Sequence, residues 1–190
     1  MKKNLFLMKL LAFRKKTTFL TFALFFGLFV SSVSRISGQE IMHVDALLAS
    51  YNLNTEEGRS EKEELEKMLY GLNPTLFLKE GTVKQYGESL PVLVCSDVLS
   101  LELLYKENPL FSKTAIIRIS IDNLTDLSAL LDLDKLSSFV NLKYIVFSSS
   151  FEICAGETNK SSCELGKISA MIHSSTGNNF KILCQVSVPE

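Results

Sequence analysis

Histidines that could act as general bases are scarce in this chain, which has only two, His43 and His173. A Ser/His/Asp or Cys/His arrangement needs an imidazole to take the proton from its nucleophile. His43 lies in the N-terminal segment, so such an arrangement would depend on His173. We expect His173 at a helix end, where an imidazole commonly interacts with the last carbonyl groups. The histidines therefore favour a protein without catalytic residues, and the alternative is a small hydrolase that uses His173.

The remaining polar residues match no cofactor or metal motif. The sequence contains no Gly-x-Gly-x-x-Gly, Walker or His-Glu-x-x-His pattern. An acidic series is present, comprising Asp122, Asp126, Asp132 and Asp134. It lacks the closely alternating oxygen ligands and the turn glycine of a calcium loop, and helix capping with a solvated face explains it. We therefore expect no cofactor and no metal ion.

The cysteines offer disulfide chemistry, because all four follow an expected export signal. Cys154 and Cys163 bracket a short hydrophilic loop and are the pair that we expect to be bonded. Cys95 and Cys184 fall at inward positions of expected strands, where a cysteine is usually a small buried apolar side chain. A zinc site with four thiolates is disfavoured, since the chain lacks close Cys-x-x-Cys pairs.

The N-terminal residues 1–38 predict a secretory signal peptide. Basic residues precede an uncharged stretch from Thr17 to Ser34, which is the order found in such signals. Small residues allow cleavage after Ser34 or after Gly38, and we favour Gly38. The cleaved protein would be secreted or placed in the periplasm or cell envelope. The uncharged stretch also approaches the minimum length of a membrane-spanning helix. The alternative is therefore a protein with an uncleaved single-pass anchor.

The charge of the remaining chain disfavours two kinds of partner. The whole chain has 20 basic and 21 acidic residues, and residues 1–38 hold seven of the basic and none of the acidic ones. Residues 39–190 thus carry 13 basic and 21 acidic residues, a net charge of −8. Nucleic acids and anionic lipids require a positive surface. We expect no nucleic-acid partner, and membrane contact only if the N-terminal segment remains as an anchor.

Two regions, 39–89 and 90–190, contain the elements that would position these residues. Region 39–89 predicts two short helices followed by a small hairpin. An apolar stripe over residues 44–51 indicates the first helix, and Ser60 with Glu63 matches the capping box of the second. Two β-forming runs separated by a turn predict the hairpin at 75–86.

Region 90–190 predicts an α/β fold in which short parallel strands alternate with helices. Apolar, β-branched runs indicate the strands, and amphipathic intervals indicate the helices. The strands are expected at 92–95, 116–121 and 144–147, and the helices at 97–106, 125–139 and 164–173. A final strand at 180–188 is expected to be the last strand or an edge strand. Strand, helix and strand at this short spacing imply parallel strands joined by right-handed crossovers.

One pattern occurs three times at intervals of 26 residues. Its copies are Leu90-x-x-Leu93-x-Cys95, Ile116-x-x-Ile119-x-Ile121 and Leu142-x-x-Ile145-x-Phe147. Together with the Thr-Asp-Leu-Ser that follows the middle copy, residues 90–150 resemble the leucine-rich repeats of internalin-like proteins. The resemblance implies a solenoid core built from the framework residues and a binding surface formed by the strands. The alternative is a compact α/β domain with three or four parallel strands.

The outward side chains of these strands form the surface that we nominate for binding. They are Val92, Val94, Arg118, Ser120, Lys143, Tyr144 and Val146. Exposed together, they would combine an apolar patch with positive charge, as contact sites often do. Alternatively, the N-terminal helices cover the patch and its valines belong to the core. We expect an exported, non-catalytic module that binds a protein or a cell-envelope macromolecule; the alternatives are a small hydrolase and a purely structural envelope protein.

Overall fold

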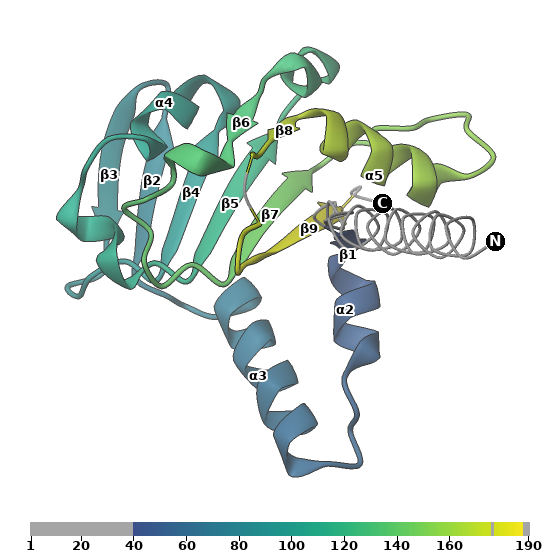
Figure 1. Ribbon diagram of the computed structural model, residues 1–190, viewed down its shortest axis with the longest axis horizontal. Helices are drawn as coiled ribbons and strands as arrows, with labels where there is room; N and C mark the ends of the chain where they lie inside the picture. The colour runs from purple at the N-terminus through teal and green to yellow at the C-terminus, as the bar shows by residue number, and fades with distance from the viewer. Residues whose placement is uncertain (1–39, 176, 188–190) are drawn as a thin grey trace, which may run out of the picture. The chain divides into compact units, whose positions relative to one another are not determined.

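The computed structural model describes residues 40–175 and 177–187. Its main feature is a seven-stranded sheet (Figure 1). Its strand order is β1-β9-β7-β5-β4-β2-β3, and every neighbouring pair is parallel except the β2–β3 hairpin. The strands are β1 (Ile41–His43), β2 (Thr75–Lys79), β3 (Thr82–Tyr86), β4 (Leu93–Asp97), β5 (Ile116–Ile121), β7 (Tyr144–Ser149) and β9 (Lys181–Val186). A separate parallel pair joins β6 (Leu131–Asp132) to β8 (Ile172–His173).

Helices connect the strands, and several of them are short. The α-helices are α2 (Val44–Ser50), α3 (Glu56–Tyr70), α4 (Leu101–Leu104) and α5 (Lys160–Ala170). The 3-10 helices are η1 (Val98–Ser100), η2 (Pro109–Lys113), η3 (Leu124–Ser128) and η4 (Leu133–Lys135). The expected signal peptide and the alternative anchor fall on residues 1–38, outside the described residues.

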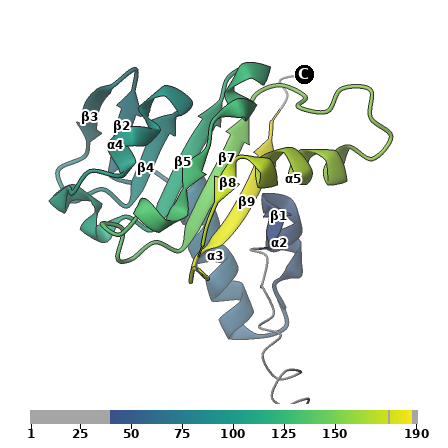
Figure 2. The ribbon, with the colours of Figure 1, turned by 45° about the horizontal axis from the view of Figure 1, so that its top comes forward.

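Both faces of the central strands β5 and β7 are packed, which explains why these strands are mostly apolar. On the first face, strand residues such as Ile119 and Phe147 pack with α4, α5 and the 3-10 segments. On the second face, Ile116 and Val146 pack with Leu65 and other apolar residues of α2 and α3. Figure 2 shows α2 and α3 beside β7 and β9 and clear of β2 and β3. The second face is therefore covered over only part of its width.

Helix α3 begins earlier than the sequence pattern predicts. Thr55, not Ser60, is the N-cap, and its Oγ1 accepts a hydrogen bond from Gly58 N at 3.1 Å. Glu56 and Glu57 occupy the first turn, where negative charge favours a helix N-terminus. A Cβ at Gly58 would lie 2.3 Å from the carbonyl oxygen of Asn52, so glycine here permits a close backbone approach and does not break the helix.

The α/β class with parallel strands is confirmed, but the sheet is wider than the three or four strands expected. The helix expected at 125–139 is wrong, because that segment forms η3, β6 and η4. The final strand is not an edge strand, since β9 lies between β7 and β1. It joins β1 to the sheet, whereas β2 and β3 join through β4.

The 26-residue pattern does not set the strand register. Leu93 pairs with Ile116 and not with Ile119, and Ile119 pairs with Phe147. As a consequence Cys95 faces the second side of the sheet, whereas Ile121 and Phe147 face the first. The leucine-rich-repeat form of the fold is therefore not confirmed.

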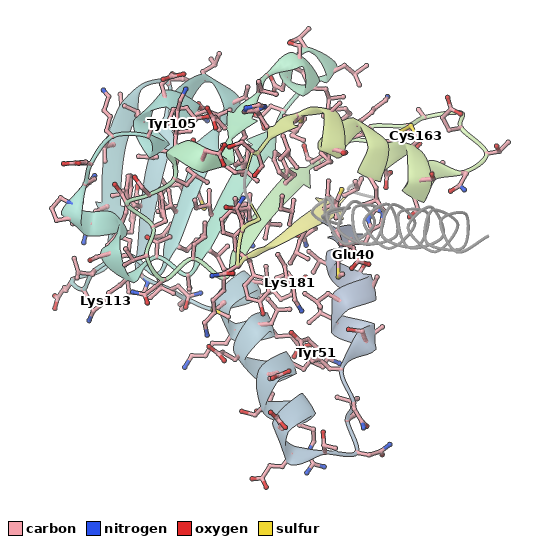
Figure 3. The ribbon with its side chains drawn as sticks, viewed as in Figure 1. Glu40, Tyr51, Tyr105, Lys113, Cys163 and Lys181 are labelled. Carbon is pink, nitrogen blue, oxygen red and sulfur yellow. A yellow bond between two sulfur atoms is a disulfide. The ribbon has the colours of Figure 1, made fainter. Side chains whose placement is uncertain are left out.

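The expected disulfide joins Cys154 to Cys163, with their Cα atoms 6.2 Å apart, and Figure 3 marks Cys163 on α5. Cys95 and Cys184 are free thiols. A disulfide indicates an oxidising, exported environment. Within residues 40–175 and 177–187, no helix has both the length and the apolar character needed to cross a bilayer.

Candidate functional site

The seven residues nominated from the sequence do not form one exposed surface. Val94 and Val146 are fully buried on opposite faces of the sheet, so neither can contribute to an open patch. Val146 is core because α2 and α3 cover it, as the alternative interpretation required. Val92 and Ser120 are half-buried. The error has a physical cause: both faces of the sheet are packed where Val94 and Val146 lie, so each of them points into a core.

Two nominated residues instead hold the N-terminal helices on the second face. Lys143 is exposed, and its Nζ donates to Oε1 of Glu64 on α3 at 2.7 Å. Tyr144 is half-buried beside Tyr51, which follows α2. Burial, and then the hydrogen bond to Tyr144, raises the pKa of Tyr51 to about 12. Both residues therefore have structural partners within the chain.

Arg118 lies at the centre of the second face and fastens the end of α3 to the sheet. One guanidinium nitrogen donates to the carbonyl oxygen of Leu69, in the last turn of α3, at 2.6 Å. A cation at this end of a helix also interacts favourably with the helix dipole. Nε of Arg118 is buried and has no hydrogen-bond partner among the described residues. One side of this half-buried side chain thus remains unsatisfied.

We expect Arg118→Gln to lower the free energy of unfolding by about 1.5 kcal/mol, because a charge-assisted hydrogen bond to a helix end is lost. Urea denaturation would measure the change. Lys84→Gln, on the exposed strand β3, is the matched control and should alter stability by less than about 0.5 kcal/mol. Equal stabilities of the two variants would contradict the structural role of Arg118.

An uncovered strip of the second face remains beyond α3. Phe77 on β2 pairs with Cys95 on β4, and Cys95 pairs with Arg118 on β5, so the three side chains follow one another across this face. Tyr86 of β3 packs edge-on against Phe77, with ring centroids 5.3 Å apart. Tyr70, the last residue of α3, does not belong to this strip. Its hydroxyl accepts a hydrogen bond from Nε2 of Gln185 at 3.4 Å, on β9, which β7, β5 and β4 separate from β2. We call Phe77, Tyr86, Cys95 and Arg118 the aromatic face.

The charges around the aromatic face differ in sign from those of the domain as a whole. Lys84 of β3 lies opposite Phe77 and points to the same side of the sheet, and Lys79 is two residues beyond Phe77 on that side. Together with Arg118 they give positive charge next to exposed rings. Burial raises the pKa of the Cys95 thiol, and Arg118 lowers it by less, so this cysteine remains protonated near neutral pH.

A pocket of about 600 Å³ opens at the carboxyl ends of β1 and β9, beside the start of α5. His43, Glu164 and Cys184 are among its lining residues. Nε2 of His43 lies 3.6 Å from Oε2 of the buried Glu164. Ligands of parallel sheets commonly bind at this edge. The histidine and the carboxylate could therefore contact a small polar ligand.

The thiol in this pocket is not an activated nucleophile. Burial, and then the charge of Glu164, raises the pKa of Cys184 to about 12. Nucleophilic cysteines need a lowered thiol pKa, because the thiolate is the reactive form. Cys184 thus fits the buried apolar role expected from the sequence.

His173 lies in β8, not at a helix end, and pairs with Asp132 of β6. One ligand atom from each of Asp132, Asp134 and His173 lies within 4.8 Å of the others. Two members of the acidic series cap helices, as expected. The carboxylate of Asp126 accepts from the backbone of Asn123 at the start of η3, and that of Asp132, the N-cap of η4, accepts from the backbone of Asp134. Asp132 and Asp134 also form part of a histidine-containing cluster.

Sequence reasoning missed both histidine environments for the same reason. His43 and His173 end strands of three and two residues, which are too short for periodicity to reveal. Their partners, on α5 and β6, lie far away in the sequence. Comparison of the chain with protein-family models, curated proteins and solved structures found no match.

Proposed function

We propose that this protein is an exported, non-catalytic binding domain that contacts a protein partner through its aromatic face. The observation that carries the proposal is the exposure of Phe77 (41%) and Tyr86 (59%), whose rings pack against each other on neighbouring strands. Tyrosine, phenylalanine and arginine are enriched in protein interfaces, where their burial supplies much of the binding free energy.

The aromatic face is preorganised for binding. Phe77 and Tyr86 lie on paired strands and already hold each other edge to face, so little side-chain entropy remains to be lost on association. Lys79 and Lys84 add positive charge at its border. A partner with apolar groups beside carboxylates would match both features, and the charges would speed its approach.

Site-specific photo-crosslinking in the cells that export the protein tests this proposal. We expect a photoreactive amino acid in place of Phe77 to give a discrete adduct with one protein. The matched control is the same amino acid in place of Val140, an exposed apolar residue outside the aromatic face. The proposal is wrong if neither position gives an adduct, as for a purely structural protein, or if both give the same products.

Once the partner is identified, its affinity tests the contribution of individual residues. We expect Tyr86→Ala to weaken binding by about 2 kcal/mol, because an aromatic anchor at an interface is removed. Lys84→Glu should slow association and reduce its dependence on salt. Leu124→Ala, at another exposed apolar residue, is the control and should leave the affinity unchanged.

A further inference from the structure

The short parallel pair β6–β8 places Asp132 beside His173. The neighbouring Leu131 is buried, and its N–H donates to the carbonyl oxygen of Met171 at 2.7 Å. The N–H of Asp132 donates to the hydroxyl of Tyr105 at 2.9 Å, and Figure 3 shows Tyr105 on the same side of the molecule as β6. The backbone under both potential ligands is therefore fixed by packing and hydrogen bonds.

The donor atoms of this cluster are close enough to share one ion. The carboxylates of Asp132 and Asp134 and a ring nitrogen of His173 lie within 4.8 Å of one another. Ligands bound to one zinc ion at about 2.0 to 2.2 Å are at most about 4.4 Å apart. His173 is exposed, so a small rotation of its side chain would close the difference.

Contacts behind the carboxylates orient them. Oδ2 of Asp134 accepts hydrogen bonds from both the N–H and the hydroxyl of Ser175, the former at 2.9 Å. Oδ1 of Asp132 accepts from the N–H of Asp134 at 3.2 Å. Such second contacts are a regular feature of metal sites, because they fix the orientation of the ligands.

We propose that Asp132, Asp134 and His173 bind a divalent transition-metal ion such as Zn²⁺. One imidazole nitrogen and two carboxylate oxygens suit such an ion, and three protein ligands leave a further position for water. The bound ion would link Asp132 of β6 to His173 of β8. This site is separate from the aromatic face, and the proposal does not depend on the function proposed for that face.

Substitution of Lys135 distinguishes a metal site from a cluster with only a structural role, because only a metal site should gain zinc affinity. Its Nζ lies 3.2 Å from Oδ2 of Asp132, so the ammonium competes with a metal ion for this carboxylate. Lys135→Gln should therefore bind zinc more tightly than the wild type. Ser175→Ala should bind about 10-fold more weakly, because Asp134 loses a contact that orients it.

Calorimetric titration of the purified, disulfide-bonded protein with zinc chloride is the experiment. We expect one saturable site, lost in His173→Ala, and a rise in Tm of roughly 5 to 10 °C when zinc exceeds Kd 100-fold. With cobalt, the spectrum should show no thiolate absorption, because no cysteine belongs to the site. Asp122→Asn and His43→Ala are controls for an exposed carboxylate and for the other histidine, and both should bind like the wild type.

Three results would overturn the proposal. The first is the absence of saturable binding to the wild type. The second is equal loss in His43→Ala and His173→Ala, which would show non-specific histidine binding. The third is weaker binding by Lys135→Gln, which would show that the carboxylate of Asp132 is not a ligand.

Discussion

Phe147→Ala is expected to lower the free energy of unfolding by about 3 to 5 kcal/mol. Phe147 lies in β7, between β5 and β9, and its side chain is almost completely buried on the first face. Truncation removes a large apolar group from contact with the core and leaves a cavity that surrounding strands cannot fill, because hydrogen bonds hold them on both sides. Urea denaturation followed by circular dichroism would measure the loss.

Leu124→Ala is the control for Phe147→Ala. Leu124 begins η3 and is 60% exposed, so its truncation should change stability by less than about 0.5 kcal/mol. A loss below about 1 kcal/mol in Phe147→Ala would place this residue outside the core and would contradict the packing of the central strands.

Removal of the disulfide is expected to cost about 2 to 3 kcal/mol, the loop-closure entropy that the bond takes from the unfolded chain. The bond joins Cys154 to Cys163, nine positions apart, and Cys163 lies in the first turns of α5. Combined Cys154→Ser and Cys163→Ser substitutions should show this loss. Reduction of the wild-type protein should produce the same loss in the same denaturation assay.

The doubly substituted protein also controls for the free thiols. Its stability should not change when reductant is added, because Cys95 and Cys184 are already reduced. Further destabilisation by the reductant would mean that these two cysteines form a bond of their own. A wild-type protein that is insensitive to reductant would contradict the contribution of the Cys154–Cys163 bond.

The central strands could be predicted because the composition of each short segment by itself favours a strand. Runs such as Ile116–Ile121 have the β-branched, apolar composition of a strand that is buried on both sides. The hairpin β2–β3 could be predicted because a turn separates two matching runs. The disulfide followed from the position of its cysteines around a polar loop.

The segment 125–139 shows where local patterns fail. Its leucines are spaced as in an amphipathic helix, but Leu131 pairs with Ile172 of β8, and Ala129 leaves η3 in an extended conformation. Contacts with residues far along the chain therefore override the helical spacing. The sequence of this segment alone does not show that β8 will pair with it.

The exposure of the nominated strand residues was mispredicted for a related reason. Outward and inward positions can be told apart only when the register and the covering elements are known. The sequence does show that Phe77 and Tyr86 are aromatic and that Lys84 is charged, but not that α3 ends before it reaches them. The pattern therefore predicted an apolar surface with positive charge, and the structure places that combination mainly on β2 and β3.

The pairing of the first described strand with the last has a kinetic consequence. Ile41 pairs with Ile182, so the β1 edge of the sheet cannot form until residue 182 has been synthesised. Contacts between such distant segments slow folding, because a long loop must close before the pairing gains any free energy. Until β9 has emerged, β1 and one edge of β7 therefore lack their partner strand.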